Sequence, residues 1–300
     1  MKKIIGLLAV LSTVVFWGIS FISASQILTK IDPLVLGFFR YVLAAVFIGV
    51  VVIVRRVDLR VSKRDLLIFF LAVILGIFLY SILENTALTL ISAAAASIIT
   101  ALTPMAMVLG NFLVHRAKIS LSEGLLIVIS IAGVVLVLYN DLAAGFGGKQ
   151  WLGYGIMLLS IGFWTAYSLM TQKITVKYSS LKVTAIQSFM TLFFFIPTLF
   201  IAPFPKFGTF TFLDWGNLLF LGVICSGLCY FLFITSVKFL GVTLPNLLLN
   251  FIPIVTIITN AILQHQEIDG LQIIGGIIVV LSMTVLTIDN MKRSEVKNNL

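Results

Sequence analysis

The chain has 300 residues, of which 60% are hydrophobic and only 10% are charged. Soluble globular domains usually carry about 25% charged residues, so this composition excludes a soluble protein. The net charge of +9 would suit a nucleic-acid-binding protein, but the basic residues lie between apolar stretches, in a pattern that membrane topology explains better. We therefore expect the lipid bilayer, and no nucleic acid, as the partner of this chain.

Ten apolar stretches follow one another with short connections. Most of them are about 18 residues long or longer, the length that indicates a membrane-spanning helix. Because a backbone in lipid must satisfy its own hydrogen bonds, we expect an all-α integral membrane protein with ten transmembrane helices. The predicted spans are 4–24, 33–54, 66–87, 91–114, 121–139, 151–172, 182–202, 214–237, 242–263 and 270–288.

The first stretch, in which Lys2 and Lys3 precede an apolar core, has the pattern of a secretory signal peptide or of a first span. It is long enough to cross the membrane, and its pattern returns later in the chain. We therefore expect an uncleaved first span.

The basic residues alternate between loops. With a cytoplasmic N-terminus, sixteen Lys and Arg residues fall on the cytoplasmic side, and three, Lys30, Lys149 and Lys206, fall outside. Arg40 stays within a span. The positive-inside rule thus predicts a multi-pass plasma-membrane protein with both termini in the cytoplasm.

The first three spans carry polar and aromatic residues at depth. Trp17 lies roughly 20 Å into the first span, deeper than an interfacial tryptophan, so we expect it to line a cavity, with simple packing as the alternative. Arg40 in the second span must face protein or water, because a cation at the bilayer centre costs about 2.5–3.5 kcal/mol. Tyr80 and Glu84 are four residues apart and share a helix face. Asn85 follows them.

Arg40 and Glu84 lie at similar depths from the outer side. We expect an Arg40–Glu84 ion pair or a shared polar site that binds or gates a solute. The alternative is a structural pair near the outer interface, which could still act as a gate.

The fourth and ninth spans are interrupted by Pro104 and Pro253. Proline cannot donate to the helix ladder, so it kinks or opens the helix, and we expect both prolines to be hinges. Asn246 and Asn250 share a face of the ninth span and are either interhelical contacts or ligands of a solute.

The remaining spans add Trp164 in the sixth, Gln187 in the seventh and Tyr230 in the eighth as candidate cavity residues. The apolar stretches LLIVISIAGVVLVLY of the fifth span and LQIIGGIIVVLSMTVLTI of the tenth lack charge, and we interpret these spans as a peripheral scaffold or an oligomer face. Cys225 and Cys229 lack redox spacing and are interpreted as packed side chains. His115 and His265 fall in loops on opposite sides, so neither a metal site nor a cofactor is expected.

The two halves of the chain echo each other. A shift of 147 residues places Trp17 on Trp164 and Arg40 on Gln187, and a shift of 149 places Pro104 on Pro253. We predict a duplication into repeats 1–144 and 145–300. Each has five spans, so the second is inverted relative to the first, an arrangement in which secondary transporters bind solute between the halves.

The chain resembles the drug/metabolite transporter superfamily in its ten-span, EamA-type form. The resemblance rests on FWGISF around Trp17, GFFRYVLAA with Arg40, ENTALTLISAAAASIITALTP from Glu84 to Pro104, FWTAYSL at Trp164 and FLGVTLPNLLLNFIPIV to Pro253. It implies a central cavity formed by spans 1–4 and 6–9 and alternating access without ATP. Such proteins move amino acids, other metabolites or drugs, often outward.

The leading hypothesis is therefore a secondary transporter of a small solute, with a proton as a possible coupling ion, acting as a monomer or homodimer. A non-transporting sensor or assembly protein and an intramembrane enzyme are the alternatives. The sequence lacks the catalytic motifs H-E-x-x-H and G-x-S-x-G, and it lacks a nucleotide-binding motif.

Overall fold

The computed structural model describes residues 1–116, 119–139, 148–264 and 270–298, and the regular structure in these ranges is entirely helical. Nine helical segments in this part are long and apolar enough to cross a membrane. The remaining predicted span, the fifth, corresponds to the shorter apolar helix α7, Leu121–Val137. The predicted all-α membrane fold is thus confirmed. The boundary predicted between residues 144 and 145, and His265, lie outside the described residues.

The predicted spans correspond to single helices or to two or three helical segments joined end to end. They are α1 (Lys2–Ile27), α2 (Pro33–Val54), α3 (Lys63–Val73) with η1 (Ile74–Leu79) and α4 (Tyr80–Leu88), α5 (Ala93–Thr100) with α6 (Thr103–His115), α7, α9 (Gln150–Thr175), α10 (Ser180–Phe195) with η2 (Ile196–Phe200), α11 (Phe212–Leu219) with η4 (Phe220–Leu228) and α12 (Cys229–Leu240), α13 (Thr243–Leu249) with α14 (Ile252–Gln264), and α15 (Gly270–Asn298).

Several helices begin at residues whose chemistry favours a helix start. Asp32 caps α2, its carboxylate accepting from the Leu34 amide at 2.8 Å, and Pro33 occupies the first position. Ser62 and Thr211 cap α3 and α11 in the same way. These caps fix where the chain re-enters the membrane.

Two of the membrane segments are broken by proline. The α5–α6 segment is interrupted at Ala101 and Leu102, just before Pro104, and the α13–α14 segment at Asn250 and Phe251, just before Pro253. Because proline has no N–H, the carbonyl four residues earlier loses its helical partner. The chain therefore changes direction at both points.

Two other segments contain wide turns. The π-helices η1 and η4 interrupt the segments that run from α3 to α4 and from α11 to α12. Such turns leave backbone carbonyls outside the usual ladder and often occur at functional sites. In η4, the Cys225 carbonyl accepts a bond from Trp17 Nε1 at 3.1 Å.

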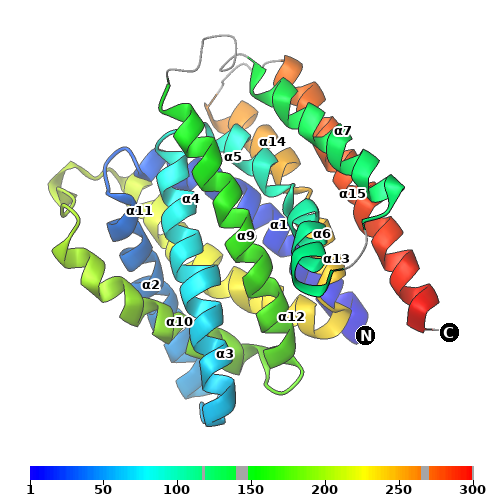
Figure 1. Ribbon diagram of the computed structural model, residues 1–300. Coiled ribbons are helices and arrows are strands. Elements are labelled where there is room, and N and C mark those ends of the chain that lie inside the picture. Colours follow the sequence, from blue (N-terminus) through cyan, green and yellow to red (C-terminus); the bar gives the residue numbers. More distant parts are fainter. Residues whose placement is uncertain (117–118, 140–147, 265–269, 299–300) are drawn as a thin grey trace.

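The helices pack closely where glycine replaces larger residues. A Cβ on Gly76 of η1 would lie 1.8 Å from Tyr167 Cβ of α9, so only glycine lets these segments meet. Gly275 of α15 lies against the Gly133 carbonyl of α7 in the same way. Figure 1 shows α7 and α15 side by side along one edge of the bundle, as expected for the two plain spans.

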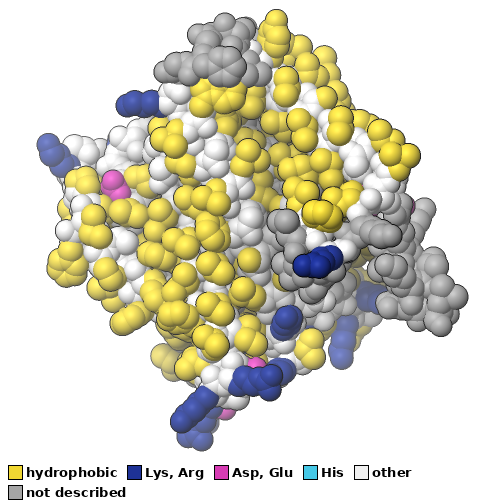
Figure 2. All heavy atoms as spheres, viewed as in Figure 1, with side chains coloured by type: hydrophobic (Ala, Val, Ile, Leu, Met, Phe, Trp, Pro, Cys, Tyr) yellow, Lys and Arg dark blue, Asp and Glu magenta, His cyan; other side chains and the backbone are white. Residues whose placement is uncertain are grey.

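The surface matches a protein embedded in lipid. Figure 2 shows hydrophobic side chains over most of the visible flank, with many Lys and Arg side chains at the lower end, where α3 begins. The N and C ends lie toward the same end of the bundle in Figure 1, as an even number of spans requires.

Candidate functional site

A cavity lies where α1, α2, α4, α9 and α12 meet the two broken segments, α5–α6 and α13–α14. Its volume is about 40 Å³, room for roughly two or three water molecules. Six of the side chains predicted from the sequence line it: Trp17, Arg40, Tyr80, Glu84, Trp164 and Tyr230. The structure thus brings together residues that are far apart in the chain.

Arg40 is 6% exposed and is held by neutral partners. Its Nε donates to Ser226 Oγ at 3.0 Å, and its NH1 donates to Asn85 Oδ1 at 3.3 Å. Asn85 in turn donates to the Pro33 carbonyl at 3.2 Å. These contacts orient the guanidinium without neutralising its charge.

Glu84 is half-buried and accepts a bond from the Tyr80 hydroxyl at 2.6 Å. Among the described residues, no ion pair joins Glu84 to Arg40. The predicted direct pair is therefore not formed in this structure, although both groups border the same cavity. An acidic and a basic side chain therefore both remain available to a solute in the cavity.

Aromatic rings make up much of the cavity wall. The rings of Trp17 and Trp164 meet edge to face at 5.3 Å, and Trp17 contacts Tyr230 at 5.5 Å in the same geometry. Tyr80 packs on Trp164 at 5.3 Å. Such rings provide apolar area and fixed shape, which suits a solute that has an apolar part.

Four predicted residues do not line the cavity but lie around it. Asn85 positions Arg40, as described above. Asn246 Oδ1 accepts from Trp164 Nε1 at 3.1 Å and from Ser168 Oγ at 3.3 Å. Gln187 accepts from the Tyr167 hydroxyl at 3.0 Å.

Asn250 is the fourth of these residues and differs from the others. It is 0% exposed, and neither its Nδ2 nor its Oδ1 has a hydrogen-bond partner in the described part of the chain. It lies directly at the break between α13 and α14. An unpaired amide thus adjoins Leu249, which lines the cavity.

The two proline breaks bring further groups to the cavity. In the first segment, Thr100 and Thr103 line the cavity. Pro104 has no N–H to donate to the Thr100 carbonyl, and this carbonyl accepts from the Thr103 hydroxyl at 2.6 Å instead. In the second segment, Leu249 and Ile252 take these places. We find that polar residues border the cavity at one break and apolar residues at the other.

Some cavity contacts were not expected from the sequence. Ser226 holds Arg40, and Phe233 packs against Trp164 at 5.1 Å. Ser226 shares a helix face with Tyr230, which was a candidate, so the four-residue spacing carried a usable signal. Phe233 is one of 25 phenylalanines, and nothing in its neighbourhood distinguishes it.

The sequence also matches the model of a known protein family. The model of the EamA-like transporter family matches residues 4–139 and again residues 151–288. The chain belongs to the EamA-like transporter family. It is therefore a multi-pass membrane transporter and not an enzyme.

Relatives of this EamA-like chain are similar over most of its length. A protein of Archaeoglobus fulgidus described as an uncharacterized transporter is 25% identical over 92% of this chain and 94% of its own. The uncharacterized transporter YxxF of Bacillus subtilis is 25% identical over 96% of this chain and 90% of its own. The Escherichia coli protein YhbE, described as an uncharacterized inner membrane transporter, is 25% identical over 58% of this chain and 55% of its own.

A crystal structure of another protein has the same fold as the EamA-like chain. It superposes with a TM-score of 0.68, covering 95% of this chain and 98% of that one, at 19% sequence identity. The likeness is one of fold alone.

Proposed function

We propose that this EamA-like protein is a secondary transporter that moves a small metabolite, amino acid or drug across the cytoplasmic membrane by alternating access, in the direction of export. The observation that supports this most directly is the cavity, in which Arg40 and Glu84 are close to one another without forming an ion pair, among aromatic walls. A solute with both a negative and a positive group and an apolar part matches these walls best.

The small volume of the cavity fits a closed state. About 40 Å³ holds water but no metabolite, since ligand sites usually measure about 300–1,000 Å³. Loading a solute must therefore separate the helices that line the cavity. The breaks before Pro104 and Pro253 are the places where we propose that the helices bend.

Two inverted repeats are part of this proposal. The family model matches the chain twice, with five predicted spans in each match. The breaks at 101–102 and 250–251 are 149 residues apart, the shift already found between the two prolines. This spacing supports a duplication into repeats 1–144 and 145–300, with the solute site between them.

The orientation follows from the basic residues. We propose that both termini lie in the cytoplasm, because sixteen Lys and Arg residues then fall on the cytoplasmic side. Together with the short loops, this supports a location in the plasma membrane.

The test is a metabolite profile of cells that overproduce the protein, compared with cells that produce the Arg40→Ala or Glu84→Gln variant. Loss of a charge-assisted contact costs about 1.5–3 kcal/mol, so each variant should lower solute movement by roughly tenfold to a hundredfold. Arg55→Ala is the control, because Arg55 is an exposed arginine that directly follows α2.

Membrane levels of each variant are measured in parallel. Normal solute movement by both cavity variants, at equal membrane levels, would remove Arg40 and Glu84 from the mechanism.

A further inference from the structure

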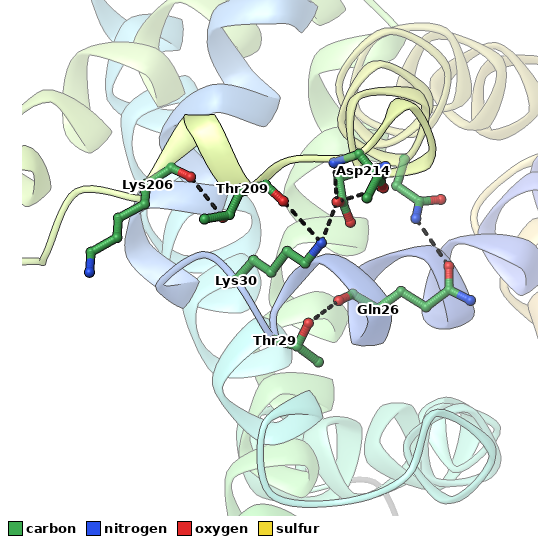
Figure 3. A network of polar contacts seen from close by, with 8 residues as sticks. Gln26, Thr29, Lys30, Lys206, Thr209 and Asp214 are labelled. Atoms are coloured by element: carbon green, nitrogen blue, oxygen red, sulfur yellow. Dashed lines mark hydrogen bonds and ion pairs between the residues drawn. The ribbon is translucent and has the colours of Figure 1, made fainter.

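Two aspartates far from the cavity each bind a lysine from the other half of the chain. Lys30, in the turn between α1 and α2, has its Nζ 2.5 Å from Asp214 Oδ2, near the start of α11. Lys177, in the turn between α9 and α10, has its Nζ 2.6 Å from Asp65 Oδ1, near the start of α3. Figure 3 shows Lys30 reaching across to Asp214, with the Thr209 carbonyl beside its amine.

Each aspartate is built into the start of its helix. The Asp214 carboxylate also accepts from the Thr211 amide and hydroxyl, both at 2.7 Å. The Asp65 carboxylate accepts from Ser62 Oγ at 2.7 Å and from the Tyr178 hydroxyl at 2.8 Å. When the two halves separate, Asp214 keeps the Thr211 donors and Asp65 keeps Ser62 Oγ. Tyr178 directly follows Lys177 in the chain, so its hydroxyl leaves Asp65 together with the lysine.

The lysines are the mobile partners of these pairs. The side chains of Asp214 and Asp65 are 9% and 6% exposed, whereas those of Lys30 and Lys177 are 33% and 56% exposed. A lysine on a flexible stem can move from the carboxylate into water at small cost. The pairs can thus break and re-form without leaving a buried charge unsolvated.

The two pairs occupy equivalent positions in the two halves. Lys177 lies 147 residues after Lys30, and Asp214 lies 149 residues after Asp65. These are the shifts that relate the two cavity tryptophans and the two hinge prolines. Each aspartate is the third residue of its helix and follows a hydroxyl cap.

The pairs lie on opposite faces of the membrane. Since α1 and α2 each cross it, the start of α3 is on the same face as the N-terminus, and the turn that contains Lys30 is on the other. The cavity lies between the two faces, because Trp17 in the middle of α1 lines it. Each pair therefore joins the two halves at one end of the solute path.

We propose that Lys30–Asp214 and Lys177–Asp65 are the latches of two gates, one at each face, and that one latch must break before the cavity opens to its side. This inference rests on the alternating access proposed above. Both latches are formed in this structure, which agrees with the small volume of its cavity.

The test measures access to the cavity and needs no solute. Thr100→Cys places a single thiol on the cavity wall once Cys225 and Cys229 are replaced by alanine. A membrane-impermeant maleimide is added to right-side-out and to inside-out vesicles, and the labelling rate from each face is measured for Lys30→Met and for Lys177→Met.

Lys30→Met should raise the labelling rate from the face that carries Lys30 by about fivefold, because an exposed ion pair contributes up to about 1 kcal/mol. The labelling rate from the opposite face should stay unchanged. Lys177→Met should do the same at the other face. Asp214→Asn, which keeps the size of the side chain and an oxygen for the Thr211 donors, should reproduce the effect of Lys30→Met.

Matched controls are available at both faces. At the face of Lys30 the control is Lys206→Met, because Figure 3 shows the amine of Lys206 turned away from Asp214. At the other face the control is Lys173→Met, because Lys173 is exposed on α9, four residues before Lys177. The Thr100→Cys protein with intact latches should label from both faces. If it does, latch variants that label at the same rate as these controls would refute the proposal that the two ion pairs are latches. Labelling of that protein from one face only overturns alternating access itself.

Discussion

Asn250 offers a sharp test of how the break in the α13–α14 segment works. Both polar atoms of its side chain are buried without a partner among the described residues. An unsatisfied buried polar group costs about 1–3 kcal/mol. Leucine is of similar size and needs no partner, so Asn250→Leu should stabilise the closed state by about 1–3 kcal/mol.

Asn246, one helical turn earlier, provides the matched comparison. Its side chain accepts from Trp164 and Ser168 and donates to the Val242 carbonyl at 2.8 Å. Leucine here would leave those donors unpaired in the core, so Asn246→Leu should destabilise the protein by about 1–3 kcal/mol. The same substitution should thus change stability in opposite directions at two positions of one membrane segment.

The assay is thermal unfolding of the purified protein in detergent. At roughly 2 °C per kcal/mol for a chain of this size, Asn250→Leu should raise the midpoint by about 2–6 °C, and Asn246→Leu should lower it by a similar amount. Solute movement by Asn250→Leu should also slow, because a more stable closed state opens less often. A fall in midpoint for Asn250→Leu as large as that for Asn246→Leu would refute the reasoning.

Two further outcomes follow from the packing and from the cavity. Gly76→Ala would place a methyl group against Tyr167 and should destabilise the protein by about 1–3 kcal/mol or more. Gly155→Ala, with nothing within 4 Å of its added Cβ, should be neutral or should stabilise the protein by up to about 1 kcal/mol. Thermal unfolding in detergent distinguishes the two variants. If Glu84 carries the coupling proton, an imposed pH gradient should drive solute into vesicles of the unaltered protein but not of Glu84→Gln; solute uptake that ignores the gradient in both would exclude proton coupling.

The fold could be predicted well because lipid imposes a strong and local rule. Apolar length alone located the spans, and Asp32 with Pro33 located the start of α2. Pro104 and Pro253 located the helix breaks to within a few residues. The π-helices could not be predicted, since packing between helices, such as that of Gly76 on Tyr167, makes them favourable.

The candidate site was predictable in its residues but not in its contacts. A charged group within an apolar span is costly enough to stand out, and Arg40 and Glu84 do line the cavity together with the four aromatic candidates. The four amide candidates lie around the cavity instead. Which partner each group binds depends on distant helices: Arg40 is held by Ser226, 186 residues away. The four-residue spacing of Tyr80 and Glu84 did indicate that these two side chains lie together. No local pattern indicates that Asn250 lacks a partner.

The edge-to-face contact between Trp17 and Trp164 means that the intrinsic tryptophan fluorescence of the protein should report on the cavity. Only four tryptophans occur in the chain, and the rings of these two are in contact, with centroids 5.3 Å apart, in the cavity wall. Indole emission depends on polarity and on neighbouring rings, so anything that enters between them must change the fluorescence of half of the fluorophores. Candidate solutes can therefore be screened on the unlabelled protein with ultraviolet light.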